Sequence, residues 1–386
     1  MKSRKLLIVS TVSTMKSGLS WSLIGLSRIL KDKGIDFSVL ISKHGELEDK
    51  LRDIGVSCVI IPYHKYGWYT RGGRDSLIQK GKNAVKRLVN RIALARIKGL
   101  IRRERFDLVH INALTDDIGA RAAMETDTSF IWHIREFMEE DLGIRFCDRE
   151  RAGREMNAAA FIIAVSGEVA KKFQPMVTGD IRVIYNGIDI DRFYCTRDIL
   201  KDRPVRICMP GRIVPQKGQD HLISAVISLT QKGYDGIRVQ FIGVTRDEAY
   251  AAELKEMVKK AGREDMFEFV GFTDRIEEYY KNSDIVCVCS AKEAFGRVTI
   301  EGMVAGTLVI GTNTGGTTEL IKDGETGYLY QGDQASLEAV LEKAISDPQK
   351  SRMVAKKGQA WARELFSTEK NAQEIIKIYE EAWQMQ

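Results

Sequence analysis

The sequence contains no apolar run that approaches the roughly 20 residues a helix needs to cross a membrane. The first apolar segment, residues 5–11, is too short for the core of a signal peptide, and it lacks a small-residue cleavage site. The six cysteines are scattered, and none has the C-x-x-C spacing of a zinc or redox site, so we expect them to be reduced. Together these absences predict a cytoplasmic protein.

Two further absences narrow the class of protein. The fingerprint G-x-G-x-x-G does not follow the first apolar run, which argues against a nicotinamide-dependent enzyme. The chain also has no short-period repeat and no low-complexity tract. What remains is a chain of 386 residues, of which 44% are apolar and 29% charged, and this length predicts two or three globular domains.

Short apolar runs alternate with amphipathic segments along most of the chain. Residues 5–10 form the first such run, and residues 18–32 carry leucines at spacings of three and four, which predicts a helix. Later runs in the first half span residues 37–41, 56–62, 107–112, 130–134, 157–166 and 181–184. A second series spans residues 205–209, 239–243, 266–271, 284–290 and 307–311. This alternation predicts parallel, doubly wound sheets of the α/β class.

Residues 292–320 hold the most informative motif. A predicted buried strand at 284–290 leads into an acidic turn, and an amphipathic helix over 297–305 follows. The carboxyl end of a strand beside a helix N-terminus is where open α/β sheets bind ligands and where free amide groups attract phosphate. Glu293 and Glu301 lie eight residues apart, and carboxylates, which only accept hydrogen bonds, suit sugar hydroxyls. On spacing alone, two solvated surface glutamates are the simpler explanation.

A second candidate for phosphate binding is the loop at residues 210–218, Pro-Gly-Arg-Ile-Val-Pro-Gln-Lys-Gly. It also follows a predicted strand and precedes a helix that begins at Gln219. Arg212 would grip a diphosphate through two hydrogen bonds, whereas Lys217 would act as a point charge. Taken alone, such side chains in a loop are usually solvated.

Together these segments resemble the glutamate-x7-glutamate signature of retaining, nucleotide-sugar-dependent glycosyltransferases of family 4, which have the GT-B fold. The matching residues are Phe295-Gly296, Glu301-Gly302-Met303-Val304-Ala305-Gly306, Gly315-Gly316 and the Gly-Arg…Lys-Gly spacing of residues 211–218. The resemblance implies two Rossmann-like, doubly wound parallel-sheet domains facing a cleft. The implied boundaries are an acceptor-side domain at 1–193 with helix 371–386 packed back on it, a linker at 194–204, and a nucleotide-sugar-binding domain at 205–370.

The resemblance also implies roles for individual residues. The catalytic set would be Arg212, Lys217, Glu293 and His133. The donor-binding set would be Gly18, Val270, Gly271, Phe272, Phe295, Gly296, Val298, Thr299 and Glu301. Arg212 and Lys217 would neutralise the diphosphate, Glu301 would hold the ribose hydroxyls, and Glu293 would hold the sugar. Without the resemblance, Gly18 is a simple helix-entry glycine and His133 a core histidine.

The family generally works without a metal, so the resemblance implies no metal and no cofactor beyond the nucleotide sugar. Paired carboxylates at Asp189 and Asp191 invite a metal-site interpretation, because such pairs bind hard cations. However, residues 185–193 resemble the family's interdomain connection. The implied chemistry is front-face attack with retention of anomeric configuration, in which the leaving phosphate acts as the base.

The implied function is transfer of a sugar from a nucleoside diphosphate sugar to a hydroxyl of a lipid-linked or growing polysaccharide in envelope glycan synthesis. Three alternatives stay open. A nucleotide-sugar 2-epimerase would need its own acid/base carboxylates and histidines. An enzyme like glycogen phosphorylase would need a pyridoxal-binding lysine context. A catalytically inert partner subunit would usually have lost the basic clamp or the glutamates.

Residues 65–105 break the α/β alternation and carry 13 basic and 2 acidic side chains. Three aromatic residues precede a helix predicted over residues 75–104, namely Tyr66, Trp68 and Tyr69. Its apolar positions are Val85, Leu88, Val89, Ile92 and Ile101. Basic amphipathic helices with aromatic neighbours suit anionic membrane surfaces, so the segment predicts peripheral contact with the inner leaflet. The alternatives are a packed helix with a solvated basic face and, without any supporting motif, nucleic-acid binding.

Overall fold

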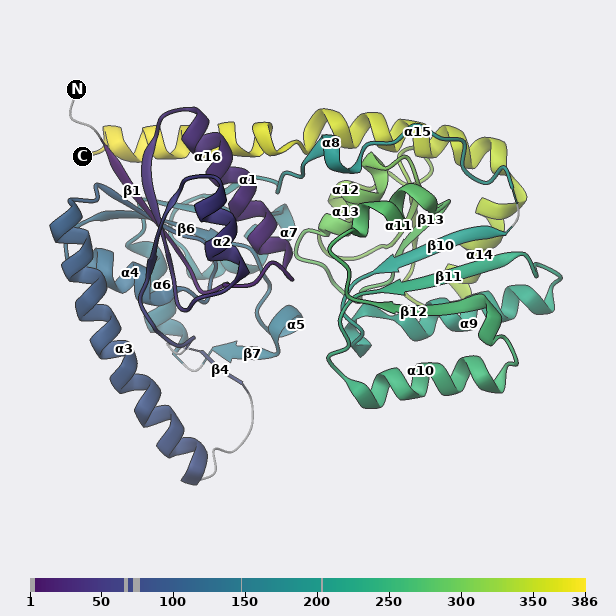
Figure 1. Ribbon diagram of the computed structural model, residues 1–386, viewed down its shortest axis with the longest axis horizontal. Coiled ribbons are helices and arrows are strands. Elements are labelled where there is room, and N and C mark those ends of the chain that lie inside the picture. Colours follow the sequence, from purple (N-terminus) through teal and green to yellow (C-terminus); the bar gives the residue numbers. More distant parts are fainter. Residues whose placement is uncertain (1–3, 66–68, 72–76, 147, 203) are drawn as a thin grey trace. The chain divides into compact units, whose positions relative to one another are not determined.

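The computed structural model describes residues 4–65, 69–71, 77–146, 148–202 and 204–386 (Figure 1). The chain forms two compact units. Unit 1 comprises Met1–Gly187 and Thr368–Gln386, and unit 2 comprises Ile188–Ser367.

Unit 1 is built on a seven-stranded sheet in the order β3-β2-β1-β5-β6-β8-β9, in which every neighbouring pair is parallel. The strands are β1 (Lys5–Ser10), β2 (Asp36–Ile41), β3 (Ser57–Ile60), β5 (Leu108–Ile111), β6 (Ser129–Ile134), β8 (Phe161–Ala164) and β9 (Ile181–Val183). The continuous apolar runs of the five central strands, β2, β1, β5, β6 and β8, are buried on both faces because helices cover the sheet, whereas the edge strands β3 and β9 are more exposed. A short antiparallel pair, β4 (Tyr69–Arg71) and β7 (Ile144–Phe146), lies outside this sheet.

The helices of unit 1 connect successive strands. They are α1 (Gly18–Asp32), α2 (Glu46–Asp53), α3 (Leu77–Glu104), α4 (Asp117–Met124), α5 (Glu139–Leu142), α6 (Arg149–Asn157) and α7 (Gly167–Phe173). The Ser17 side chain caps α1 by accepting the Leu19 N–H at 3.2 Å. The C-terminal helix α16 (Thr368–Gln384) packs on α1, and its Tyr379 hydroxyl hydrogen-bonds Nδ1 of His110 on β5 at 2.6 Å.

Unit 2 holds a six-stranded parallel sheet in the order β12-β11-β10-β13-β14-β15. Its strands are β10 (Val205–Pro210), β11 (Ile237–Ile242), β12 (Phe267–Gly271), β13 (Ile285–Val288), β14 (Leu308–Thr312) and β15 (Tyr328–Tyr330). Its helices are α8 (Ile190–Phe193), α9 (Gln219–Gln231), α10 (Glu248–Lys260), α11 (Ile276–Asn282), α12 (Arg297–Val304), α13 (Thr317–Leu320), α14 (Gln334–Ser346) and α15 (Pro348–Leu365). The prediction of two doubly wound parallel sheets is confirmed.

The boundary between the units differs from the predicted one. The predicted linker at 194–204 packs on unit 2, where the Ile199 and Leu200 side chains are buried in the core. Arg197 pairs with the buried Asp284 carboxylate at 2.6 Å, and the same carboxylate accepts the Leu200 N–H at 2.9 Å. The polar composition of residues 194–204 predicted a linker, but the segment contributes two core residues and one partner of a buried ion pair to unit 2.

Within the described residues, no helix has both the length and the apolar character that a membrane span requires. The described cysteines, at positions 58, 195, 208, 287 and 289, are all free. Cys147 lies outside the described residues.

Candidate functional site

The loop after β10 is held tightly against the loop after β13. Gly218 has φ +69°, and a Cβ atom there would approach the Cys289 carbonyl oxygen to 2.5 Å, so only glycine fits. The Ala291 N–H donates to the Gln216 carbonyl at 3.0 Å. The two loops therefore form one continuous edge at the carboxyl end of the sheet.

The loop after β14 completes this edge. Its Gly316 N–H donates to the Glu293 carbonyl at 2.8 Å, and a Cβ atom on Gly316 would lie 2.6 Å from the Ala294 carbonyl oxygen. The Thr314 hydroxyl donates to the Ala291 carbonyl at 2.8 Å. Three consecutive strands of the sheet, β10, β13 and β14, thus present their loops as one packed surface.

Three of the four predicted catalytic residues gather on this surface. The Lys217 ammonium forms an ion pair with Oε1 of Glu293, and the Ser290 hydroxyl donates to the same oxygen. The Glu293 side chain is 17% exposed. Burial by itself would raise the pKa of Glu293, but the charge and hydrogen bond of Lys217, the Ser290 hydroxyl and the charge of Arg212 outweigh it and lower that pKa. Glu293 is therefore an ionised acceptor with cations beside it.

Glu301 lies on α12, whose N-cap is Gly296 at φ +92°. Its Oε2 accepts the Tyr280 hydroxyl at 2.9 Å, and its Oε1 lies 3.2 Å from the Arg297 guanidinium. Among the other predicted donor contacts, Val298 and Thr299 lie in the first turn of α12. Their backbone amides belong to a helix N-terminus, which favours anions, although the Thr299 N–H already donates to the Gly296 carbonyl at 2.9 Å.

The remaining predicted donor contacts of unit 2 differ in exposure. The Phe295 ring is buried and packs edge-on against Phe366, so Phe295 can offer a ligand only its backbone. Val270 and Gly271 end β12, on the same sheet edge as the loops above, and the Phe272 side chain after them is exposed. The position of a nucleobase at this strand end stays a prediction.

In unit 1, Gly18 is the exposed first residue of α1. His133, by contrast, is fully buried within β6 and stacks on His110 at 5.5 Å between ring centroids. Among the described residues, neither ring nitrogen of His133 finds a hydrogen-bond partner. Burial, together with the charges of Arg135 and His110, lowers the pKa of His133 well below its usual value, so the ring is neutral. This placement is at odds with the sugar contact that the resemblance implied.

The side chain that emerges beyond the end of β6 is that of Arg135. Its Nε donates to Oδ1 of Asn112 at 3.1 Å, and its NH1 donates to Oδ1 of Asn186 at 2.5 Å.

Asp189, one of the two carboxylates that invited a metal-site interpretation, has a structural role: its carboxylate caps α8 by accepting the Arg192 N–H at 3.1 Å. Metal independence stays a prediction.

Sequence reasoning missed Ser290, Tyr280 and Arg297. Ser290 offered a weak signal, since it is a polar residue that closes an apolar strand. Tyr280 offered none, because it is the second of two adjacent tyrosines in a charged helix. Arg297 is a cation at a helix N-terminus, where the helix dipole disfavours it, and that mismatch is a usable signal.

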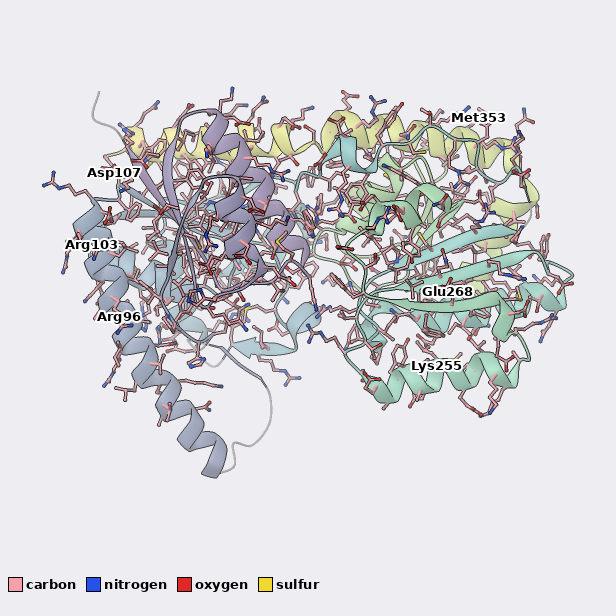
Figure 2. The ribbon with its side chains drawn as sticks, in the orientation of Figure 1. Arg96, Arg103, Asp107, Lys255, Glu268 and Met353 are labelled. Atoms are coloured by element: carbon pink, nitrogen blue, oxygen red, sulfur yellow. The ribbon has the colours of Figure 1, made fainter. Side chains whose placement is uncertain are left out.

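The two halves of α3 differ. Ala93, Leu94, Ile97, Leu100 and Ile101 are buried, and the helix packs on α4. The earlier residues Val85, Leu88 and Ile92 are 61%, 60% and 50% exposed. Figure 1 shows the first turns of α3 extending away from the rest of unit 1, and Figure 2 labels Arg96 and Arg103 on this helix. The predicted apolar stripe is therefore partly core and partly surface. Tyr66 and Trp68 lie outside the described residues.

Two family models match the chain in succession. The model for Glycosyltransferase Family 4 matches residues 16–192, and the model for Glycosyl transferases group 1 matches residues 197–361.

The similarity to curated relatives covers only part of the length of each relative. The lipopolysaccharide core biosynthesis mannosyltransferase LpsB of Rhizobium meliloti is 30% identical over 241 residues, which cover 59% of this chain and 66% of the relative. The N-acetyl-alpha-D-glucosaminyl L-malate synthase of Bacillus anthracis is 28% identical over 56% of this chain and 58% of the relative. The chain thus spans between 48% and 66% of the length of the first four relatives it matches.

Solved structures match over nearly the whole chain. Anabaena Alr3699/HepE in complex with UDP-glucose has a TM-score of 0.79 and 22% identity, covering 98% of this chain and 99% of that one. Sucrose-phosphate synthase from Thermosynechococcus elongatus has a TM-score of 0.78 and 19% identity, covering 99% and 100%. At these identities the likeness demonstrates a common fold. With both family models matched in order and the fold shared, this chain belongs to the family 4 glycosyltransferases of the GT-B fold.

Proposed function

We propose that the chain is a retaining glycosyltransferase that moves a sugar from a nucleoside diphosphate sugar to an acceptor hydroxyl. The observation that carries this proposal is the gathering of Lys217, Glu293 and Arg212 on packed loops at one edge of the unit 2 sheet, with Glu301 on helix α12, which follows the Glu293 loop. The fold-sharing protein Alr3699/HepE binds UDP and UDP-glucose in its solved structures, which supports a nucleotide sugar as donor.

Arg212, Lys217 and the first-turn amides of α12 would stabilise the diphosphate as it leaves, since preorganised donors aimed at developing charge lower the barrier. Lys217 pairs with Glu293. A bound diphosphate would offer Lys217 a second anionic partner. Glu293, kept ionised by its surroundings, would then accept hydrogen bonds from sugar hydroxyls.

In the transfer step, the bond between the anomeric carbon and the diphosphate oxygen would break while the acceptor oxygen bonds to the same face of that carbon. The leaving phosphate oxygen would take the proton of the acceptor hydroxyl. This step requires no protein nucleophile, and both carboxylates of the motif, Glu293 and Glu301, would serve in binding.

A lipid-linked or polymeric acceptor in envelope glycan synthesis is the acceptor class that we favour. The basic first half of α3, with its exposed apolar side chains, suits an anionic membrane surface on the cytoplasmic side. The relative LpsB acts in lipopolysaccharide core biosynthesis by name, which supports the same class.

Donor hydrolysis by the purified full chain, screened over UDP-, GDP- and ADP-sugars, tests the proposal. We expect slow release of free sugar from one donor, with the anomeric configuration retained. An epimerised nucleotide sugar as product would favour the epimerase alternative. If the chain neither binds nor hydrolyses any donor, the result would favour an inert partner subunit.

A further inference from the structure

The carboxylate of Glu301 is held from two sides. The Tyr280 hydroxyl donates to Oε2 at 2.9 Å, whereas the Arg297 guanidinium lies 3.2 Å from Oε1. Tyr280 lies on α11, which precedes β13 in the chain. Arg297 lies in the first turn of α12, the helix that also carries Glu301. A hydrogen bond to one oxygen and an ion pair at the other constrain both the position and the plane of the carboxylate, whose terminal torsion is otherwise broad.

Tyr280 acts only from the buried side. Its side chain is 0% exposed, and its ring packs edge-on against Phe193 at 5.6 Å between centroids. A ring in this position cannot touch a ligand. Burial and the charge of Glu301 raise the pKa of Tyr280 well above its usual value, so the hydroxyl remains protonated and donates to Glu301 at every physiological pH.

The Glu301 carboxylate has more acceptor positions than Tyr280 and Arg297 occupy. An ionised carboxylate offers about four lone-pair positions, two on each oxygen. Tyr280 and Arg297 take one on each oxygen. Among the residues that the structure describes, this leaves one position on each oxygen, which matches the two adjacent hydroxyls of a ribose.

We propose that Tyr280 is a positioning residue for nucleotide recognition, which fixes the Glu301 carboxylate so that both of its oxygens accept ribose hydroxyls. The inference rests on the proposed function, in which Glu301 binds the ribose. Without Tyr280, the carboxylate is free to rotate toward Arg297, four residues earlier on the same helix, and both oxygens then turn away from the ligand. The hydroxyl of Tyr280 therefore sets selectivity for ribonucleotides over deoxynucleotides.

Isothermal titration with UDP and GDP, and with the 2′,3′-dideoxy form of whichever binds, tests this assignment on the full chain. We expect the wild-type protein to bind the ribonucleotide at least about tenfold more tightly than the dideoxy form, since hydrogen bonds to charged groups are the strong ones. Tyr280→Phe should weaken ribonucleotide binding about tenfold and leave dideoxynucleotide binding within about twofold.

Tyr279→Phe is the matched control, because it makes the same substitution one residue away on the same helix. We expect it to leave both affinities unchanged. A double-mutant cycle adds a second readout: in a Glu301→Ala background, Tyr280→Phe should cause no further loss of ribonucleotide affinity. The cycle also separates an effect through Glu301 from a general loosening of the fold.

Each other result overturns the inference in its own way. Equal weakening of both nucleotides by Tyr280→Phe would give the tyrosine a purely structural role. Unchanged binding in Tyr280→Phe would mean that Arg297 suffices to hold Glu301. A wild-type protein that binds a ribonucleotide and its dideoxy form equally would remove Glu301 from the ribose. A wild-type protein that binds no nucleoside diphosphate would instead overturn the proposed function, and this inference with it.

Discussion

The carboxyl edges of the two sheets place their functional candidates differently. In unit 2 the charged side chains of Lys217 and Glu293 lie on loops that glycines pack closely together, and they remain partly exposed. In unit 1 the candidate His133 lies within a strand and is fully buried. A loop that leaves a strand end presents its side chains at the edge, whereas a strand residue faces whichever helix covers that side of the sheet.

The largest effect should come from the clamp of unit 2. Arg212→Ala or Lys217→Ala should lower kcat/KM by roughly 10²-fold or more, because each removes a contact to the developing charge worth about 3 kcal/mol. Steady-state kinetics with the nucleotide sugar that the wild-type protein hydrolyses measures the change in kcat/KM. Lys260→Ala, an exposed lysine on α10, is the control and should keep full activity. Wild-type turnover in either clamp variant would remove these residues from the diphosphate site.

The exposed half of α3 predicts salt-sensitive binding to anionic liposomes. Each basic residue near an anionic surface contributes about 1 kcal/mol, and this attraction fades within a Debye length. Charge reversal at Lys86, Arg87 and Arg91 should therefore abolish co-sedimentation with anionic liposomes and leave donor hydrolysis intact.

Met353→Ser, which removes an exposed apolar side chain of unit 2, is the control and should bind liposomes normally (Figure 2). Equal binding to anionic and zwitterionic liposomes, or binding to neither, would return α3 to a solvated basic face. A soluble acceptor would then be as acceptable as a lipid-linked one.

The packed glycines of unit 2 predict a large stability difference between two positive-φ positions. Gly218→Ala adds both αL strain and a clash with the Cys289 carbonyl, whereas Gly262→Ala at φ +60° meets no atom within 4 Å. Strain alone costs about 1–2 kcal/mol, so Gly262→Ala should destabilise by that amount and Gly218→Ala by clearly more. Urea denaturation monitored by hydrogen exchange in β10 distinguishes them. Equal losses would mean that the loop yields easily and does not hold Lys217 in place.

Much of this contrast could be predicted from the sequence. Local sequence pattern predicts the strands with long apolar runs and the Gly-Arg…Lys-Gly loop, because neighbouring residues determine both. The three-residue strand β15 was missed, since its alternation is too short to detect. The environment of His133 could not be predicted for a different reason. Its neighbour His110 is hydrogen-bonded to Tyr379, which lies 269 residues further along the chain. Sequence spacing carries no information about such a contact.

Carboxylates of the two units should give stability slopes of opposite sign with pH. Glu293 has a lowered pKa when folded, so its contribution is present above the unfolded pKa and is lost as the pH falls through the folded one. Burial and the neighbouring Glu155 raise the pKa of Asp117 to about 7, so the folded state retains a proton that the unfolded state releases, and stability falls as the pH rises from about 4 to 7.

Each slope is at most about 1.4 kcal/mol per pH unit. Glu293→Gln should flatten the slope measured by hydrogen exchange in β13, and Asp117→Asn should flatten the one measured in β8. A flattening that appears in the other unit's strands would contradict the assignment of these carboxylates to separate cores.

The smallest effect should come from His133→Phe, and it is the sharpest test of the contrast between the units. Both ring nitrogens are buried, and within the part of the chain that the structure describes they have no partner, so they lose hydration on folding without a compensating hydrogen bond. Phenylalanine keeps a ring stacked on His110 and removes those polar atoms, at an overpacking cost of about 1 kcal/mol. We expect kcat/KM to stay within about threefold of wild type and the unfolding midpoint to change little. A loss of 10²-fold or more in kcat, without a change in stability, would place this histidine against the sugar after all, because only a ring nitrogen that contacts the reacting group could cost so much.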